Sequence, residues 1–278
     1  MPELPEVETI ARALREGGRG GSSLLGLRVL HVQVYWDRSI QIPDVKNFKQ
    51  KIANQVIEDI GRRGKFLVFQ LSDDDLLVHL RMSGDLRVET IQQNGMTRSV
   101  GKHDRVVFQL EKDFRLVFED TRKFGRVWLV PDAEEVVGHL GPEPFDPELD
   151  SGVFFQYLTS KKRMIKPLLL DQNFLAGMGN IYTDEALFLA GIHPQTRSDR
   201  LTTEQAGCLL SSIRIVLSKG IDQNGASIDW VYRGGNFQNH FQVYGRTGKE
   251  CYTCGHAIER IRVGQRSSHF CPVCQPEK

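Results

Sequence analysis

The amino-acid sequence predicts an α+β protein with antiparallel β-structure in its first half, helices in its second half and a metal-bound hairpin at its end. Three observations support this fold class. Short runs rich in Val, Leu and Phe recur between residues 27 and 130, separated by turn residues, which is typical of a β-sandwich or barrel. The hydrophobic period becomes helical beyond about residue 150. Two Cys-x-x-Cys pairs close the chain.

A short helix is expected at the start of the chain. Pro5 suits its first turn, where the missing N–H has no hydrogen bond to lose. The glycine-rich residues 17–21 end the pattern. Four apolar residues recur at helical spacing and form one face: Val7, Ile10, Ala11 and Leu14.

Strands follow this helix, with one further helix expected near Val45–Ala53. Each expected strand is short, apolar and bounded by turn residues. The segments are Arg28–Val34, Phe66–Leu71, Leu76–Met82, Arg105–Leu110, Arg115–Glu119 and Val127–Val130.

The second half begins after Gly138–Asp150, which holds Gly-Pro, Glu-Pro and Asp-Pro steps. Proline disfavours helix in the residue before it, so this segment is expected to be a linker. Thr202 and Gln205 are spaced as a capping box for the last helix, and Gly220 is expected to end it. The expected helices are Val153–Leu158, Pro167–Leu170, Asn180–Ala190 and Thr203–Lys219.

Composition indicates an ordinary globular protein of one or two domains, with 278 residues, 40% hydrophobic and 26% charged. No apolar run approaches the roughly 20 residues of a membrane-spanning helix. Residues 1–6 lack the basic and apolar regions of a signal peptide. We therefore expect a cytoplasmic, nucleoid-associated protein without membrane contact. The net charge is +1, but residues 151–278 carry +5 and the first 150 carry −4, so the second half can supply a basic face for phosphates.

Four of the five cysteines are expected to hold one structural Zn²⁺. The two pairs are separated by 16 residues, and without an export signal they indicate metal ligands rather than disulfides. A site of four thiolates is closed, so the ion has no open position for catalysis. The ligands are Cys251, Cys254, Cys271 and Cys274.

Residues 257–270, between the cysteine pairs, are long enough for a hairpin. It carries Arg260, Arg262, Arg266 and His269, which suit phosphate contact, although many zinc ribbons bind protein instead. The fifth cysteine, Cys208, is expected to be a buried packing residue.

Further motifs follow one another along the chain in a recognisable order. The chain begins Met1-Pro2-Glu3-Leu4-Pro5-Glu6 and continues with His79-Leu80-Arg81-Met82-Ser83-Gly84, Lys102-His103-Asp104, Asp120-Thr121-Arg122-Lys123-Phe124-Gly125, Lys166-Pro167, Gly177-Met178-Gly179-Asn180-Ile181-Tyr182, Ala190-Gly191-Ile192-His193-Pro194 and Gln242-Val243-Tyr244-Gly245-Arg246. With the four cysteines, these motifs span the whole sequence. The chain thereby resembles the bacterial formamidopyrimidine-DNA glycosylase family.

The resemblance implies an N-terminal antiparallel β-sandwich with flanking helices, residues 1–137, and a linker, residues 138–151. It further implies a helix-two-turns-helix DNA-binding domain with a lesion loop, residues 152–243, and a zinc finger, residues 244–278. The implied function is base excision repair by a monomer. The enzyme would excise 8-oxoguanine and formamidopyrimidines from double-stranded DNA and nick the strand by β,δ-elimination.

Four catalytic residues follow from the resemblance. Once Met1 is removed, Pro2 is the amine nucleophile, because an α-amino group has a pKa of about 8 and is partly unprotonated at neutral pH. Glu3 is the general acid that helps open the sugar. Lys65 is the proton donor in β-elimination, and Arg266 grips phosphate and serves δ-elimination. Glu6 is expected to support the Glu3 pocket.

The resemblance also implies the DNA contacts. Met82 and Phe124 are apolar wedges that fill the void left by the flipped base, and the glycine after each turn favours their exposure. The loop at 222–241 is expected to close over the base. Residue 81 is Arg where many relatives carry Gly, for which we expect only a surface change. Backbone contacts are implied for His103, Arg122, Lys162, Asn180 and Tyr244, and Arg122 also belongs to the wedge.

Two other functions compete with this one. The sister family endonuclease VIII shares the fold and nucleophile but prefers oxidised pyrimidines; Leu4 and the Arg122-Lys123-Phe124 wedge favour the purine enzyme. A non-catalytic zinc-ribbon DNA-binding protein is the second alternative. The joint presence of Pro2, Glu3, Lys65 and Arg266 argues against it.

Overall fold

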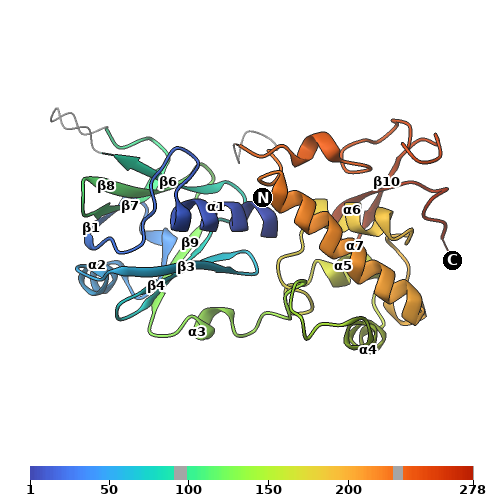
Figure 1. The fold of residues 1–278 in the computed structure, drawn as a ribbon, viewed down its shortest axis with the longest axis horizontal. Helices are drawn as coiled ribbons and strands as arrows, with labels where there is room; N and C mark the ends of the chain where they lie inside the picture. The colour runs from blue at the N-terminus through green and yellow to red at the C-terminus, as the bar shows by residue number, and fades with distance from the viewer. Residues whose placement is uncertain (91–98, 228–233, 278) are drawn as a thin grey trace. The chain divides into compact units, whose positions relative to one another are not determined.

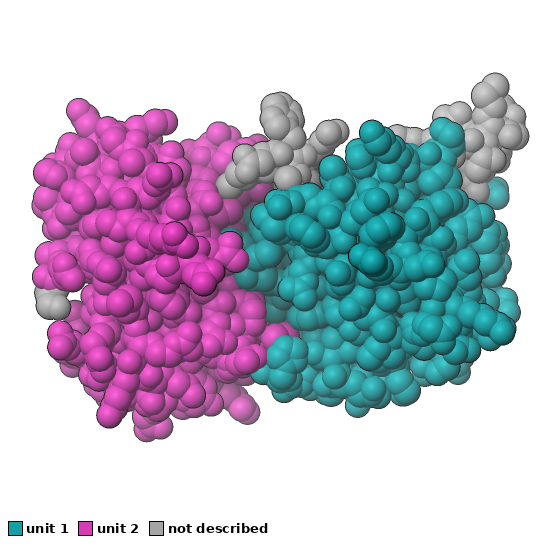
Figure 2. Space-filling model, turned by 180° about the vertical axis from the view of Figure 1, so that it is seen from behind, with its two compact units in different colours: residues 1–139, 227–235 teal, residues 140–226, 236–278 magenta. Residues whose placement is uncertain are grey.

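The structure, a computed structural model, describes residues 1–90, 99–227 and 234–277. The chain forms two compact units (Figure 2). Unit 1 comprises residues 1–139 and 227–235, and unit 2 comprises residues 140–226 and 236–278.

Unit 1 consists of two sheets that share one hydrophobic core with α1 and α2 (Figure 1). The first sheet has the order β1-β7-β8-β6 and is antiparallel throughout, and the second has the order β2-β9-β5-β4-β3. The second sheet departs from the expected antiparallel pattern at one edge, where β2 pairs parallel with β9. The elements are α1 Leu4–Glu16, β1 Val29–Val34, η1 Asp37–Ser39, β2 Ile40–Ile42, α2 Val45–Ile52, β3 Ile57–Arg63, β4 Phe66–Leu71, β5 Asp75–His79, β6 Gly84–Thr90, β7 Asp104–Leu110, β8 Phe114–Asp120, β9 Arg126–Val130 and α3 Glu134–Val137.

The six expected strands are present, but β2, β3 and β6 were not expected. β3 and β6 are rich in charged residues and glycine, so neither has a long apolar run. β3 buries only Ile57 and Ile60 among its seven residues. These strands form because neighbouring strands supply partners for their backbone groups, a cause that local composition does not reveal.

The expected first helix is confirmed as α1, with Pro5 in its first turn and Gly17 after its last. Its apolar face packs on β3 and β4. Arg62 of β3 also pairs with Glu8 of α1, Nε to Oε2, at 3.1 Å. Burial alone raises the pKa of Glu8, but Arg12 and Arg62 outweigh it and leave that pKa below its ordinary value. The start of the chain is therefore fixed to the second sheet.

Unit 2 is built around α6, which packs against α7 and β11. Residues 140–149 form no helix or strand, and Arg214 of α7 donates hydrogen bonds to the carbonyls of Pro144, Asp146 and Leu149. None of the described helices has the length and apolarity needed to cross a bilayer. The elements are α4 Ser151–Lys161, α5 Ile165–Leu169, α6 Asn180–Leu189, η2 Ser198–Arg200, α7 Thr203–Asp222, η3 Phe237–His240, β10 Glu259–Val263 and β11 Arg266–Phe270.

The last long helix begins as expected and ends later than expected. The Thr202–Gln205 capping box is present. The prediction that Gly220 ends the helix was wrong, because α7 continues to Asp222 with Gly220 buried inside it. Asn224 and Gly225 instead take positive φ angles of 56° and 79°, and Gly225 N–H donates to the Gly220 carbonyl at 2.7 Å.

Candidate active site and nucleic-acid interface

The first turn of α1 holds two buried carboxylates. Glu3 is the N-cap, and its side chain accepts from the backbone N–H of Glu6. The Glu6 carboxylate accepts in return from the Glu3 N–H at 2.7 Å. Both side chains are 2% exposed, and the positive end of the helix favours their negative charge. This reciprocal capping fixes the backbone of Glu3, which directly follows the buried Pro2.

Lys65 lies in the turn between β3 and β4 and is buried, at 6% exposed. Gly64 before it has φ 57°, which lets the two strands connect in a tight turn. Phe66 after it pairs with His79 across the sheet and meets that ring edge-on at 4.7 Å. Burial lowers the pKa of His79 to about 3, with smaller contributions from Arg81 and Lys65. His79 is thus a neutral imidazole whose Nδ1 accepts from the Arg81 N–H at 3.0 Å.

Met82 and Phe124, for which a wedge role is expected, lie on turns after strand ends. Met82 is 37% exposed and Phe124 is 46% exposed. The expected strand through Met82 is wrong at its end: β5 stops at His79, and the chain turns so that Gly84 N–H donates to the Leu80 carbonyl at 2.9 Å. The Arg122 guanidinium lies 5.2 Å from the centre of the Phe124 ring.

One buried carboxylate joins these two turns. Asp120 ends β8 at 0% exposure and accepts from the Ser83 hydroxyl of the first turn. It also accepts from the backbone N–H of Arg122 at 3.1 Å and of Gly125 at 2.7 Å in the second turn. The Ser83 Oγ in turn accepts from the Arg122 N–H at 3.0 Å. The turns that carry Met82 and Phe124 therefore share one anchor.

His103 lies directly before β7 and contacts the same strand end, Asp120. Its carbonyl accepts from the Asp120 N–H at 2.9 Å, and its Nδ1 lies 3.3 Å from Nη2 of Arg105. Arg105 also donates to the Asp120 carbonyl at 2.7 Å. The end of β8 thus positions His103 as well as the turns that carry Met82 and Phe124.

In unit 2, Asn180 begins α6, with Gly179 as N-cap in extended conformation and Gly177 at φ 93°. The positive φ of Gly177 lets the chain turn sharply just before the helix, and the N-terminal end of a helix favours a bound anion. Lys162 lies exposed at the C-cap of α4 in a left-handed conformation, φ 46°. Both residues suit contact with an anion.

The hairpin that carries Arg266 is fastened to α5 and α6 by a buried ion network. Asp184 of α6 pairs with Lys166 Nζ at 2.6 Å, and both side chains are 0% exposed. The Asp184 carboxylate also accepts from Ser268 Oγ at 3.1 Å and His269 N–H at 2.9 Å. Arg266 begins β11, two residues before the first of these contacts, and is exposed.

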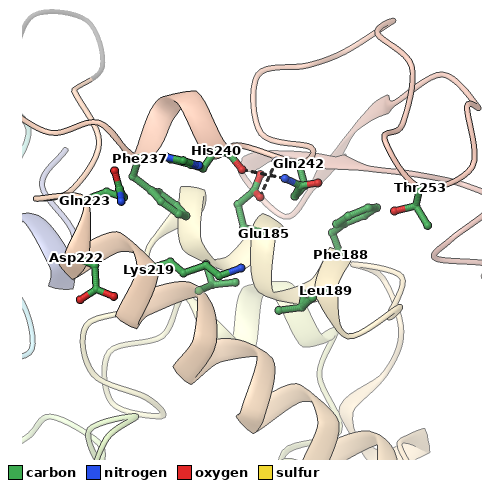
Figure 3. A pocket seen from close by; sticks show the side chains of 11 residues that line it. Glu185, Phe188, Leu189, Lys219, Asp222, Gln223, Phe237, His240, Gln242 and Thr253 are labelled. Carbon is green, nitrogen blue, oxygen red and sulfur yellow. Dashed lines mark hydrogen bonds between the residues drawn. The ribbon is translucent and has the colours of Figure 1, made fainter.

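The adjacent acid, Glu185, holds the segment 242–244 in the same way. Figure 3 shows Glu185 beside Gln242, the first residue of this segment. Its carboxylate accepts from three consecutive backbone N–H groups, those of Gln242, Val243 and Tyr244, at 2.8 to 3.0 Å. Burial raises the pKa of Glu185, against the lowering effect of these donors. The Tyr244 ring stands edge-on to His269 at 4.9 Å. Glu185 also lines a pocket of about 530 Å³ between α6, α7 and η3.

The four paired cysteines converge as expected. One ligand atom from each lies within 4.8 Å of every other. The Cys251–Cys274 and Cys254–Cys271 sulfur pairs are 3.9 and 3.4 Å apart, near the ~3.8 Å edge of a tetrahedron with 2.3 Å Zn–S bonds. The donor set and its spacing fit a tetrahedral zinc ion.

Three family models match successive parts of the chain. Residues 1–127 match the formamidopyrimidine-DNA glycosylase N-terminal domain, residues 140–231 match its H2TH domain, and residues 248–276 match the zinc finger found in FPG and IleRS. The chain belongs to the formamidopyrimidine-DNA glycosylase family. Its zinc-finger cysteines accordingly hold one structural zinc ion.

Individual relatives agree along the full length. The formamidopyrimidine-DNA glycosylase of Lactiplantibacillus plantarum is 42% identical, with 99% of each chain covered. That of Protochlamydia amoebophila is 39% identical, also with 99% of each covered. A solved complex of the Lactococcus lactis family member with FAPY-dG-containing DNA has a TM-score of 0.88 and 36% identity, covering 99% of this chain and 100% of that one. A MutM complex with carbocyclic 8-oxo-G-containing DNA gives the same values.

Several positioning residues escaped sequence reasoning. Asp120 and Lys166 lie within motifs of the family resemblance, but the sequence predicts no role for them or for Asp184 and Glu185. The available signal was the pair of adjacent acids inside the apolar helix at 180–190. Charged residues in such a position are rarely buried without partners, so they indicate anchoring contacts.

One further expectation is wrong, and another falls mostly outside the described residues. Cys208 was expected to be buried, but it is exposed on α7, because the apolar stripe of that helix turns Leu209 and Leu210 inward instead. Most of the expected lesion loop, residues 228–233, lies outside the described residues. At its described ends, the Ser227 hydroxyl donates to the Gly235 carbonyl and accepts from its N–H, each at 2.9 Å.

Proposed function

We propose that this family member excises oxidised purines from double-stranded DNA and then nicks the strand, with Pro2 as the nucleophile once Met1 is removed. The observation that carries the proposal is the Glu3–Glu6 capping box, which places two buried carboxylates directly beside Pro2. The relatives solved with DNA containing FAPY-dG or carbocyclic 8-oxo-G support this substrate class.

In the proposed reaction, the Pro2 nitrogen attacks C1′ of the damaged nucleotide. The bond from C1′ to the base breaks, and the base leaves with the bonding electrons and takes up the proton that the Pro2 nitrogen loses. Glu3 protonates the sugar ring oxygen, so the ring opens and an iminium ion joins Pro2 to C1′.

The iminium ion acidifies the C2′ proton. Its removal allows elimination of the 3′ phosphate, with Lys65 as the proposed proton donor to the leaving oxygen. A second elimination expels the 5′ phosphate, with Arg266 neutralising its charge. Water then hydrolyses the imine and frees Pro2.

The remaining site residues are proposed to hold DNA. Met82 and Phe124 enter the space left by the flipped base, and Arg122 faces the unpaired base opposite. Phosphate contacts are proposed for His103, Lys162, Asn180 and Tyr244. The protein is proposed to act as a monomer on nucleoid DNA, which sedimentation of the free protein and of its DNA complex can test.

The decisive experiment is borohydride trapping on duplex DNA with 8-oxoguanine opposite cytosine. We expect a covalent adduct whose mass places the DNA on the Pro2 nitrogen. Retained Met1 or an N-terminal tag should abolish it, whereas Pro2→Gly is a poor test because glycine still offers an amine. Glu3→Gln should slow trapping strongly, and Glu16→Gln, at the exposed far end of the same helix, should not.

The sister activity is distinguished by the lesion. Preferred trapping on thymine glycol would assign the chain to pyrimidine repair. DNA binding with no adduct on either lesion would leave only a non-catalytic DNA-binding protein.

A further inference from the structure

Two arginines beside the Met82 turn have no acidic partner in the part of the chain that the structure describes. Arg126 begins β9 and pairs with His79, the last residue of β5, and Arg81 follows two residues later. Neither arginine forms an ion pair with any residue that the structure describes. They are therefore available to an anion supplied from outside the chain.

Arg126 is held in place by the turn that carries Phe124. Its Nη1 donates to the carbonyls of Gly125, at 2.9 Å, and of Lys123, at 3.3 Å. Both bonds start from Nη1, so the Nε and Nη2 donors of the guanidinium can bind another acceptor. The contacts fix a cation to the loop that carries Phe124.

Arg81 is held by its backbone rather than by its side chain. Its φ is +54°, in the left-handed region that favours glycine, and its N–H donates to His79 Nδ1. Partial burial and the charge of Arg126 lower the pKa of Arg81. Like charges so placed repel each other, and a bound anion relieves this repulsion.

Two more cations extend this positive surface. Lys123 Nζ lies 4.1 Å from the centre of the Trp36 ring, and the Arg38 guanidinium lies 5.8 Å from it. Both side chains are exposed, and neither forms an ion pair among the described residues. The ring of Trp36 thus lies near two cations, one of which, Lys123, directly precedes Phe124 in the chain.

We propose that Arg81 and Arg126 form a binding site for a DNA backbone phosphate next to the base step that Met82 enters. A guanidinium pair suits phosphate because each arginine offers several donors in a fixed plane. The site rests on the proposed DNA substrate, and it gives Arg81 a role beyond the surface change expected from the sequence. The site would increase the affinity for DNA at the base step that Met82 enters.

The test is the salt dependence of binding to a duplex that carries a tetrahydrofuran abasic site. The double variant Arg81→Gly, Arg126→Gln removes both cations, and glycine tolerates the backbone of residue 81. Lys112→Gly is the matched control, because Lys112 is an exposed cation of unit 1 with φ 57° and no ion pair among the described residues. The conservative variant Arg81→Lys, Arg126→Lys keeps the charges.

We expect the negative slope of log K, with K the association constant, against log salt to become shallower by about 0.9 in the double variant. The affinity advantage of the unmodified protein should then shrink about 3.5-fold between 50 and 200 mM salt. The lysine variant and Lys112→Gly should keep the original slope. A double variant that folds, as judged by its melting curve, and keeps the slope overturns the site.

Failure of the proposed function has a different signature. The unmodified protein would then give no borohydride adduct, while the slopes still report on phosphate contact. If the double variant does not fold, the single variant Arg126→Gln, measured against Lys112→Gly on the same duplex, decides: an unchanged slope overturns the site.

Discussion

The Ser83 hydroxyl donates to the buried carboxylate of Asp120, and this bond joins the turn of Met82 to the turn of Phe124. The two residues are 37 positions apart in sequence. The proposed wedge of Met82 and Phe124 would need both turns to keep a fixed relative position when DNA is bound. A charge-assisted hydrogen bond in a water-free position supplies that stiffness.

Breaking this bond should destabilise unit 1 and loosen the wedge. Ser83→Ala removes one donor to a buried carboxylate and should cost about 1.5–3 kcal/mol of unfolding free energy. Asp120→Ala should cost more, because it also strips the N–H groups of Arg122 and Gly125 of their acceptor. Urea unfolding measures both changes, and the double variant should show coupling between them. Ser99→Ala, an exposed serine of the same unit, is the control; equal effects of the two serine changes would contradict the shared anchor.

Stability should fall as the pH drops, because of His79. The pKa of His79 is lowered from 6.5 to about 3 in the folded protein. Between pH 6.5 and pH 3, His79 is therefore protonated in the unfolded chain and neutral in the folded protein. The stabilising neutral form is fully favoured above about pH 6.5, and its contribution is lost as the pH falls toward 3, by at most about 1.4 kcal/mol per pH unit. His79→Gln should flatten the pH dependence of urea unfolding between pH 6.5 and 4.5. An unchanged slope, equal to that of His31→Gln, would show that another group titrates there.

The buried network of unit 2 should respond unequally to loss of its two charges. Asp184→Leu leaves the Lys166 ammonium buried without its counter-charge and should cost about 3–5 kcal/mol. Lys166→Met should cost less, because Ser268 and His269 still donate to the Asp184 carboxylate. Chemical unfolding of both variants tests this order. Disruption of the exposed Arg197–Asp199 pair is the control and should change stability very little.

Removal of zinc should weaken DNA binding while α1 stays folded. The hairpin that presents Arg266 has a small core in which Cys251 and Cys271 pack with Val243 and Ile258, so it depends on the metal. A chelator or Cys271→Ser should lower affinity for lesion DNA, with hydrogen exchange in residues 4–16 unchanged. Cys208→Ser, at an exposed cysteine outside the module, should have neither effect. Normal binding by the zinc-free protein would remove the hairpin from the DNA interface.

Sequence alone determined the features whose cause is local. The apolar face of α1, the Thr202–Gln205 capping box and the cysteine pairs each follow from spacing over a few residues, and all three are present. The family resemblance rested on the same kind of information, short motifs in a fixed order. Exposure of Met82 and Phe124 was also predictable, because a neighbouring glycine marks each turn.

Tertiary structure decided what depends on distant partners. The charged strands β3 and β6 form because adjacent strands complete their hydrogen bonds, and Cys208 is exposed because α7 turns its neighbours inward. The anchors Ser83–Asp120 and Lys166–Asp184 join residues 37 and 18 positions apart. No local pattern encodes such pairs, since the energy of a buried charge depends on which donors the rest of the fold brings to it.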